Sequence, residues 1–438
     1  MRSKPITYTG WGRVAIATSD VYRPERQTAL AALVADRPGP ALGGLRSYGD
    51  ACLNDEGTAI DMTRLDRVQS FDPETGRITV EGGVRLGDLS RWLAPRGWLP
   101  AVMPGTGFAT VGGAIANDVH GKNHHNAGSF GQHVLEMDVI TPKGAKTTGP
   151  DKLPELFKAT VGGMGQTGVI ARATLQLKAV KGDVMMVTER RVANWDEHIA
   201  LLDASQATYT VGWIDATATG ASLGRGILEE AETGAGLVPP AKKARRVPFD
   251  APGFALSPPV VRLFNATYWR RVPARGRTVV KPITDFFFPL DKIHDWNRLY
   301  GKDGFHQFQC VVPLSEADAL REMLEKIAKA GSASPLAVLK RMGPGRGGMM
   351  SFPMEGYTLA VDMPAAAAPT PGVMGELMAM TRMANGRIYL AKDALSDGEF
   401  IRAMYPDHAK WARIIAKHDP DGVMQTDLIR RLGLRSVS

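Results

Sequence analysis

The stretch PGTGFATVGGAIANDVHGKNHHNAGSF, residues 104–130, carries more chemical information than any other part of the chain. Six glycines occur within it, at positions 105, 107, 112, 113, 121 and 128, and beside them stand His120, Lys122, His124 and His125. Glycine lets the backbone approach a ligand closely, and backbone N–H groups turned into such a loop bind anions. The segment therefore predicts a binding site for a large phosphorylated ligand with titratable groups beside it.

The size and composition of the chain indicate a globular protein of two or three domains. Its 438 residues exceed what one simple core accommodates, and 44% hydrophobic with 22% charged residues is ordinary for such proteins. The N-terminus lacks the apolar core of a signal peptide, and no apolar run approaches the ~18 residues of a membrane span. Cys52 and Cys310 lie too far apart for a metal or redox motif. We expect no metal, and a protein that is cytoplasmic or periplasm-facing and at most peripheral to the inner membrane.

The net charge of +8 favours anionic partners. No nucleic-acid-binding motif occurs, so we do not expect nucleic acid among them. Two basic stretches, 242–246 and 270–277, are interleaved with proline and apolar residues. They fit either a solvated loop or contact with anionic lipid headgroups or a phosphorylated lipid, and hence peripheral membrane contact.

The pattern of apolar residues predicts an α+β protein in which the lengths of the strands and helices change along the chain. Residues 1–183 alternate short strands, helices and glycine loops, which is typical of one α+β domain. Between 184 and 386, long strand-like segments such as MMVTERRV, TVVKPITDFFFPL and FHQFQCVVP flank helices such as SEADALREMLEKIAKAG. The interval 224–277, rich in glycine, proline and charge, predicts a mobile loop. Residues 387–438 predict a strand followed by helices.

Three glycine loops occur before residue 170: GGLRSYGD at 43–50, the stretch at 104–130 and GGMGQTG at 162–168. None has the Walker spacing, and none joins a strand to a helix as the Rossmann fingerprint does. One such loop is weak evidence, because glycine turns are common. Three of them among short strands are better explained by one extended ligand.

Together with ELFKATVGGMGQTGVI and YLAKD, these loops resemble the vanillyl-alcohol-oxidase/PCMH flavoprotein family, and within it the oxidases of polyprenyl-phosphate-linked ribofuranose. The resemblance continues through FHQFQCVVP, AVDMP, AMYP and DLIRRLGL. It implies a PCMH-type two-part FAD-binding domain, in which residues 387–438 return to the N-terminal part. It also implies a substrate domain built on an antiparallel sheet flanked by helices.

The resemblance further implies that FAD lies across the N-terminal domain. The residues it assigns to the cofactor are Gly44, Arg46, Ser47, Tyr48, Gly49, Asp50, Gly105, Thr110, Val111, Gly112, Gly113, Asn117, His120, Gly121, Asn123, His124, Gly168, Val169, Ile170 and Tyr389. Many relatives attach FAD covalently through a histidine in the first glycine loop. Here that loop reads LRSYG, and no histidine precedes His120. We therefore expect non-covalent FAD.

Four residues are candidates for catalysis. When an alcohol reduces a flavin, a fixed cation near the developing negative charge lowers the barrier. Lys392 in YLAKD matches the active-site lysine of the family, and Lys122 is a second cation for the flavin or a substrate phosphate. His120 is either a proton acceptor or a structural histidine beside the flavin, and Tyr48 is a candidate for the flavin face.

Three further residues are candidates for the substrate pocket, in addition to Lys392. Gln307 and Gln309 alternate along FHQFQCV and so face one side of a strand, either a pocket or an exposed sheet face. Lys340 matches another pocket lysine of the family and suits a phosphate.

The chain departs from the family at pocket positions. Where relatives carry a pocket cysteine, an asparagine and an aromatic–histidine pair, this chain has Ala360, Thr358, and Phe287 with Phe288. These changes leave the expected flavin contacts untouched but alter sugar recognition. They also remove the thiol on which covalent inhibitors of such enzymes depend.

The resemblance therefore implies oxidation of the 2-hydroxyl of a polyprenyl-phosphate-linked ribofuranose to a 2-keto sugar, in the synthesis of cell-wall arabinan. A partner NAD(P)H-dependent short-chain reductase would then complete epimerisation to the arabinose form. One alternative is an aldonolactone or alditol oxidase acting on a free sugar or polyol, which usually carries the covalent histidine. A UDP-sugar reductase and a non-catalytic flavin-binding protein are the others, and the retained Lys122, His120 and Lys392 argue against the last. The electron acceptor, oxygen or quinone, is left open.

Overall fold

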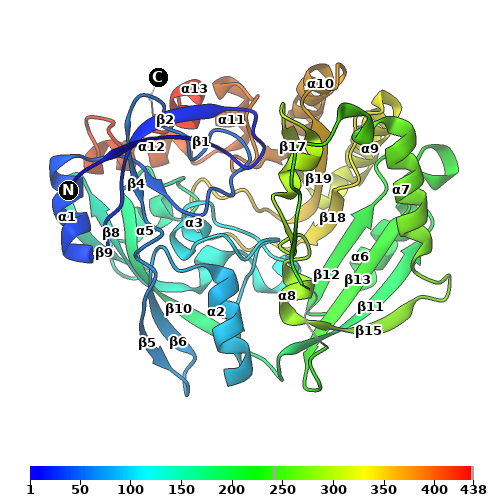
Figure 1. Ribbon diagram of the computed structural model, residues 1–438, viewed down its shortest axis with the longest axis horizontal. Helices are drawn as coiled ribbons and strands as arrows, with labels where there is room; N and C mark the ends of the chain where they lie inside the picture. The colour runs from blue at the N-terminus through cyan, green and yellow to red at the C-terminus, as the bar shows by residue number, and fades with distance from the viewer. Residues whose placement is uncertain (240–242, 436–438) are drawn as a thin grey trace.

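A computed structural model describes residues 1–239 and 243–435 (Figure 1). The α+β class is confirmed, and the chain forms two halves that lie side by side in the view of Figure 1. The blue and cyan N-terminal half also contains the red C-terminal helices, whereas the green and yellow half contains one large sheet. Among the described residues, none of the helices has both the length and the apolarity that crossing a membrane requires.

The N-terminal half contains two sheets. The first is mixed, in the order β1-β2-β4-β3: β1 (Lys4–Thr9), β2 (Ile16–Tyr22), β4 (Thr58–Asp61) and β3 (Ala41–Leu42). The second is antiparallel, in the order β5-β6-β10-β8-β9 with β7 beside β10: β5 (Val68–Asp72), β6 (Arg77–Glu81), β10 (Val169–Ala179), β8 (Val134–Thr141), β9 (Gly144–Thr148) and β7 (Trp98–Pro100). Buried residues alternate along β10 from Ala171 to Leu177, so one face of this strand packs into the core.

Short helices connect these strands and carry the glycine loops. Helix α1 (Gln27–Asp36) follows β2, and α2 (Leu86–Leu93) ends in a 3-10 turn at Ala94–Arg96 before Gly97, whose φ of 78° closes it. The glycine-rich stretch 104–130 contains α3 (Val111–Ala116) and α4 (His124–Ala127), and α5 (Pro154–Thr160) precedes the third glycine loop. The hydroxyl of Thr110 caps α3 by accepting the N–H of Gly113 at 3.2 Å.

The second half is built on an eight-stranded sheet in the order β15-β11-β13-β12-β18-β19-β17-β20, antiparallel throughout. Its strands are β15 (Arg277–Pro282), β11 (Val184–Val192), β13 (Gly226–Gly234), β12 (Tyr209–Ile214), β18 (Ala337–Met342), β19 (Gly356–Pro364), β17 (Phe305–Val312) and β20 (Arg387–Ile388). One face packs apolar residues such as Leu339 and Leu359 against α6 (Trp195–Ala204), α9 (Ala317–Ala330) and α10 (Thr370–Met383). The predicted antiparallel sheet with flanking helices is confirmed.

The interval 224–277 differs from the mobile loop predicted for it. Strand β13 begins in it and pairs with both β11 and β12, and α7 (Pro258–Arg270) follows. The glutamates of β13 concealed the strand, because they pair with basic residues of other strands of the sheet: Glu230 contacts Arg190 on β11 and Glu229 contacts Lys281 on β15. Of the first basic stretch, Lys242 lies outside the described residues.

A second difference concerns TVVKPITDFFFPL, predicted as one strand. Strand β15 ends at Pro282, and the aromatic residues that follow belong to α8 (Ile283–Phe287). Pro282 cannot donate a ladder hydrogen bond, so it ends the pairing with β11. The aromatic side chains then pack around Tyr209 instead of extending the sheet.

The C-terminal segment crosses between the halves. Strand β20 pairs with β17 in the large sheet, and α11 (Gly398–Met404), α12 (His408–His418) and α13 (Asp427–Leu432) then lie beside the N-terminal half (Figure 1). The indole of Trp411 donates to the carbonyl of Ala159 at 3.1 Å, and the N–H of Asp427 donates to the carbonyl of Leu53 at 2.8 Å. These hydrogen bonds hold the C-terminal helices against the N-terminal part of the chain.

Candidate active site

A cavity of about 690 Å³ is lined by residues of both halves. Its volume falls within the ~300–1,000 Å³ of small-molecule and cofactor sites. One wall consists of the glycine loops, and the opposite wall of side chains from β17, β18 and β19. Most residues of the segment 287–296 also line it, as do Tyr389, Ala391 and Lys392.

The cavity brings together most residues predicted for cofactor and substrate. Those that line it are Gly44, Arg46, Ser47, Tyr48, Gly105, Thr110, Gly112, Gly113, Asn117, His120, Gly121, Lys122, Gly168, Ile170, Gln307, Gln309, Lys340, Tyr389 and Lys392. They come from six separate segments of the chain, as far apart as residues 44 and 392. The glutamines of β17 therefore face a cavity and not an exposed sheet surface.

The glycine wall fits a cofactor with a long polar linker. At Gly44 a Cβ would lie 2.1 Å from the carbonyl oxygen of Phe108, so only glycine lets these two loops pack this closely. Gly112 and Gly113 present bare backbone on the same wall, in the first turn of α3. Backbone on the wall of a cavity suits the diphosphate of FAD, which can be bound without lysines. The residues present therefore fit the cofactor that the sequence predicts.

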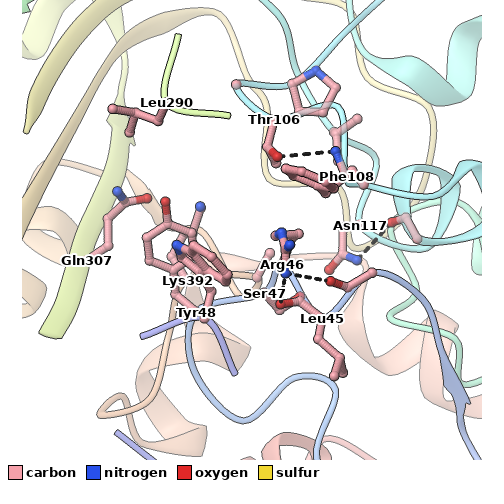
Figure 2. Close-up of a pocket in the computed structure, with 18 of the residues that line it drawn as sticks. Leu45, Arg46, Ser47, Tyr48, Thr106, Phe108, Asn117, Leu290, Gln307 and Lys392 are labelled. Carbon is pink, nitrogen blue, oxygen red and sulfur yellow. Dashed lines mark hydrogen bonds between the residues drawn. The ribbon is translucent and has the colours of Figure 1, made fainter. Parts of the chain in front are cut away.

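Arg46 braces the first glycine loop (Figure 2). Its guanidinium carbon lies 4.2 Å from the ring centroid of Trp11 and 4.8 Å from that of Phe108, and Nη1 donates to the carbonyl of Gly44 at 2.8 Å. Burial lowers the pKa of Arg46, which nevertheless remains a cation. Asn117, in the same view, donates to the carbonyl of Gly113 at 2.9 Å and holds the end of α3 against the cavity.

Lys392 lies against the ring of Tyr48, and both residues line the cavity (Figure 2). Its Nζ is 3.2 Å from the ring centroid of Tyr48, a cation–π contact between the two ends of the chain. The N–H of Tyr48 donates to the carbonyl of Ala391 at 2.9 Å and fixes this approach. Burial raises the pKa of Tyr48 well above its usual value, so its hydroxyl stays protonated.

Asp362 is a site residue that the sequence reasoning missed. Its carboxylate is fully buried on β19 and lines the cavity, accepting hydrogen bonds from Gln307 and, at 3.2 Å, from the hydroxyl of Tyr300. Burial raises the pKa of Asp362, whereas Gln307 and the nearby charge of Lys392 oppose the rise. Burial likewise lowers the pKa of Lys392, opposed by Asp362. The period of two along β19 could have revealed it, since Ala360 and Asp362 face the same side.

His120 is held between two side chains of the large sheet. Its Nδ1 lies 2.9 Å from Nζ of Lys340, and its Nε2 lies 2.9 Å from Nε2 of Gln309. Burial, followed by the charge of Lys340, puts the pKa of His120 well below its usual value, so the imidazole is neutral. Burial and then Lys122 lower the pKa of Lys340 to about 7. Because both ring nitrogens have partners, His120 can accept a substrate proton only after one contact breaks.

Lys122 connects the second glycine loop to the substrate half. Its Nζ donates to the carbonyl of Phe286 at 2.5 Å, lies 3.8 Å from the centroid of that ring, and is 3.9 Å from Glu229. Burial lowers the pKa of Lys122 to about 8. Glu229 also contacts Lys281 and Arg271, and both of these side chains pair with the buried Glu189 as well, so two carboxylates balance three basic side chains beside this part of the cavity.

Six residues predicted to hold FAD lie behind the wall and not on it: Gly49, Asp50, Val111, Asn123, His124 and Val169. Val111 and Val169 are fully buried in apolar cores. The side chain of Asn123 donates to the carbonyl of Ala101 at 2.8 Å, and Nδ1 of His124 accepts the N–H of Gly343 at 3.2 Å. Asp50 forms an ion pair with Arg431 at 2.7 Å, and Gly49 packs on the backbone of Asp393. These six residues therefore have structural contacts that explain their presence in the motifs without direct contact to the cavity.

The departures from the family pattern also lie at the cavity. Thr358, Ala360 and Phe287 line it, whereas Phe288 is buried behind it. Cys52 is the cysteine at the cavity wall, and burial raises the pKa of its thiol to about 12, as it does for Cys310. Neither thiol is therefore a nucleophilic thiolate at neutral pH.

Comparison with known proteins agrees with this geometry. Residues 23–149 match the family described as FAD binding domain. The chain is 38% identical over 450 residues to decaprenylphosphoryl-beta-D-ribose oxidase of Mycolicibacterium smegmatis, covering 97% of each protein. It is 33% identical over 371 residues to an uncharacterized protein in the mprA 5′ region of Streptomyces coelicolor, covering 80% of this chain and all of that one. Similarity to D-arabinono-1,4-lactone oxidase of Saccharomyces cerevisiae is 27% over 174 residues, 38% of this chain and 33% of the yeast protein.

Proposed function

The chain belongs to the PCMH-type family of FAD-linked oxidoreductases that act on alcohol groups, and we propose that it oxidises the 2-hydroxyl of a polyprenyl-phosphate-linked ribofuranose to a 2-keto sugar. The observation that carries the proposal is the convergence of Lys392, Lys340 and the β17 glutamines on one cavity beside the glycine wall. It is supported by similarity, over 97% of both chains, to a protein named for that substrate.

The cofactor in this proposal is FAD held without a covalent bond. The glycine wall supplies backbone for the diphosphate, and Arg46, Ser47 and Tyr48 occupy the loop where a histidine would attach the ring. No histidine occurs before His120, and the contacts of His120 with Lys340 and Gln309 engage both of its nitrogens. When bound, FAD accepts the hydride of an oxidised alcohol.

The charged side chains have distinct roles in the proposed reaction. Lys392 orients the reacting hydroxyl, because the ring of Tyr48 holds its Nζ and the charge of Asp362 acts on it. Burial disfavours the charged forms of both Lys392 and Asp362. The hydroxyl proton can therefore pass to Nζ when Lys392 is an uncharged amine, or to the carboxylate of Asp362 when Lys392 is an ammonium. His120 and Gln309 hold Lys340 at the sugar, and Lys122 with Arg271 attracts the phosphate.

The product of this step implies a partner. A 2-keto sugar is reduced at the same carbon to give the arabinose epimer, and that reduction needs a hydride donor. We therefore infer a separate NAD(P)H-dependent short-chain reductase that consumes the product in the synthesis of cell-wall arabinan. A free-sugar or lactone oxidase is less well supported, because a cluster of buried cations suits a phosphate and the lactone-oxidase similarity covers 38% of this chain.

The proposal is tested by a substrate panel read out through the flavin. Purified protein is expected to show flavin absorbance, to release FAD on acid precipitation, and to lose that absorbance anaerobically with polyprenyl-phosphoryl-ribose. Free ribose, alditols and aldonolactones serve as controls. Flavin that stays with the precipitated protein would refute non-covalent binding. Bleaching by a lactone or alditol and not by the lipid-linked sugar would refute the proposed substrate.

A further inference from the structure

Helix α7 exposes an apolar stripe on its outer side. Val260, Leu263 and Phe264 are 43%, 71% and 49% exposed, whereas Val261 and Asn265 are buried beneath them. Residues three and four apart share one face of a helix, so the exposed and the buried sets form two separate stripes. The outer stripe therefore presents apolar groups in place of the polar ones that a solvent-facing helix carries.

The segment before α7 continues this apolar surface. Phe249 and Phe254 are 68% and 72% exposed, and Phe254 belongs to the 3-10 turn Gly253–Leu256, which packs against α7. The segment is anchored from below, since the N–H of Ala251 donates to the carbonyl of Arg298 at 2.8 Å. Five large apolar side chains thus protrude within sixteen residues: Phe249, Phe254, Val260, Leu263 and Phe264, together called the docking face. Concentrated exposure of this kind marks an interaction surface.

The surroundings of the docking face are strongly basic. Residues 243–277 contain eight lysines and arginines and a single acidic residue, Asp250. Asp250 is already paired, because it contacts Arg13 at 2.7 Å and Arg298 at 3.5 Å. Arg262 and Arg270 are exposed on α7 itself, and Arg245 is exposed on the neighbouring strand β14 (Arg245–Arg246). Exposed aromatic side chains near exposed cations suit an anionic membrane, whose interface accepts the aromatic groups and whose headgroups attract the cations.

An aromatic path joins the docking face to the cavity. The ring of Phe264 stacks on Tyr268, with centroids 5.9 Å apart, and Tyr268 contacts Trp213 edge-on at 4.7 Å. Tyr268 and Trp213 both line the cavity. Arg271 lines it as well and donates to the hydroxyl of Tyr268 at 3.2 Å. A hydrocarbon chain lying along these rings would bring its phosphate to Arg271.

From these observations we propose that the docking face seats on an anionic phospholipid surface, so that a lipid-linked substrate reaches the cavity along Phe264, Tyr268 and Trp213. The inference deepens the proposed function and rests on its lipid-linked substrate. A second copy of the chain is the weaker occupant, because two such faces would bring their basic residues together without acidic partners.

The test is co-sedimentation of the holoenzyme with vesicles of phosphatidylcholine alone and of phosphatidylcholine with phosphatidylglycerol. The wild type is expected to pellet with the anionic vesicles and to be released by salt. The double variant Leu263→Ser/Phe264→Ser, Phe254→Ser and Arg262→Glu should each lose at least tenfold in binding. Ile16→Ser and Arg37→Glu are matched controls, because Ile16 on β2 is 65% exposed and Arg37 follows α1, both in the other half. These controls should bind like the wild type.

Two further readouts separate a docking defect from other failures. Melting temperature and flavin absorbance should match the wild type in every variant, and flavin bleaching by a water-soluble short-chain phosphoryl-ribose should be unchanged in Phe254→Ser and Arg262→Glu. Wild-type protein that ignores anionic vesicles, variants that bind them normally, or variants that only shift a monomer–dimer equilibrium would each overturn the proposal. Failure of the proposed function would appear differently, as a flavin that no lipid-linked ribose bleaches while vesicle binding persists.

Discussion

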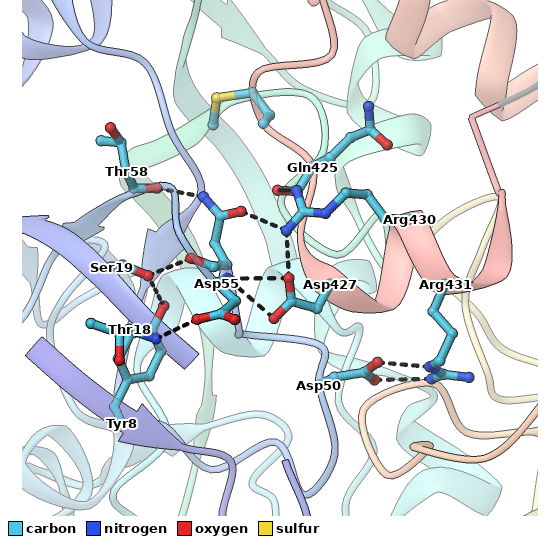
Figure 3. A network of polar contacts seen from close by, with 12 residues as sticks. Tyr8, Thr18, Ser19, Asp50, Asp55, Thr58, Gln425, Asp427, Arg430 and Arg431 are labelled. Atoms are coloured by element: carbon cyan, nitrogen blue, oxygen red, sulfur yellow. Dashed lines mark hydrogen bonds and ion pairs between the residues drawn. The ribbon is translucent and has the colours of Figure 1, made fainter. Parts of the chain in front are cut away.

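Replacing Arg431 with methionine should loosen the wall that carries Tyr48 and Lys392. The guanidinium of Arg431 joins the first glycine loop to the C-terminal segment, with Nε and Nη2 donating to Asp50 at 2.7 and 2.9 Å (Figure 3). Nη2 also donates to Asp393 at 2.9 Å, directly after Lys392. Methionine keeps much of the side-chain length but removes every one of these bonds.

The magnitude follows from the burial of the two carboxylates. The side chains of Asp50 and Asp393 are only 9% and 1% exposed, so without Arg431 two negative charges remain close together with little water. Removing one partner of a buried ion pair costs ~3–5 kcal/mol. At ~2–4 °C per kcal/mol for a domain of this size, the melting temperature should fall by ~6–20 °C. Affinity for FAD should fall as well, because the N–H of Tyr48 is bonded to Ala391 across the same junction.

The neighbouring arginine is the matched control. Arg430 pairs with Asp427, but these side chains are 43% and 25% exposed, and such pairs are worth ~0–1 kcal/mol (Figure 3). Thermal unfolding and FAD titration of Arg430→Met and Arg431→Met should therefore separate the two variants by ~2–5 kcal/mol. Equal melting temperatures and equal FAD affinities would refute the reasoning, since they would mean that Arg431 does not hold the junction.

Three other outcomes are expected. Gly44→Ala should lower flavin content and reduce the free energy of unfolding by ~1–3 kcal/mol, because its Cβ would lie 2.1 Å from a backbone oxygen. Gly372→Ala in α10 should do neither, because no atom lies within 4 Å of the added Cβ. Equal flavin content in both variants would contradict the role of the glycine wall. Without flavin, the free energy of unfolding should rise between pH 7 and about 10.5, because the pKa of Lys340 is about 7 in the folded chain against an ordinary 10.5, so only the unfolded chain binds that proton in this window. Lys340→Met should lessen but not abolish the rise of the melting temperature with pH, because burial also lowers the pKa of Lys392 to about 7 and that of Lys122 to about 8. An unchanged slope would contradict the burial of Lys340. Electrophilic ligands that react with a pocket thiol should leave the intact mass of the wild type unchanged but should form an adduct with Ala360→Cys. An adduct on the wild type would mean that Cys52 or Cys310 is reactive despite a thiol pKa of about 12.

The sequence was sufficient where a motif or a period controls the structure. Alternation along FHQFQCV placed Gln307 and Gln309 on one face of a strand, and both line the cavity. The density of glycine at 104–130 indicated close backbone approach, which the packing of this region on Gly44 bears out. These features depend on residues close together in the sequence, and local rules describe them well.

What the sequence did not predict depends on contacts between distant residues. The period of two places Asp362 on the same side of β19 as Ala360, but its hydrogen bond from Gln307 and its proximity to the charge of Lys392 exist only once β19 lies beside β17 and the C-terminal segment returns. Strand β13 was hidden by glutamates that pair with other strands of the sheet. His124 and Asn123 share the motif of His120, yet the chain turns at α4 and directs their side chains to Gly343 and Ala101.

The central claim is that this cavity oxidises carbon 2 of a lipid-linked ribose. Anaerobic stopped-flow measurement of flavin bleaching, with polyprenyl-phosphoryl-ribose carrying hydrogen or deuterium at carbon 2, tests it most directly. We expect both substrates to bleach the flavin, the deuterated one more slowly, and we expect Lys392→Met to retain flavin but lose most of this rate. If hydride transfer limits the rate, equal bleaching rates with the two substrates would contradict carbon 2 as the site of oxidation. Bleaching by free sugars alone would contradict the lipid-linked substrate.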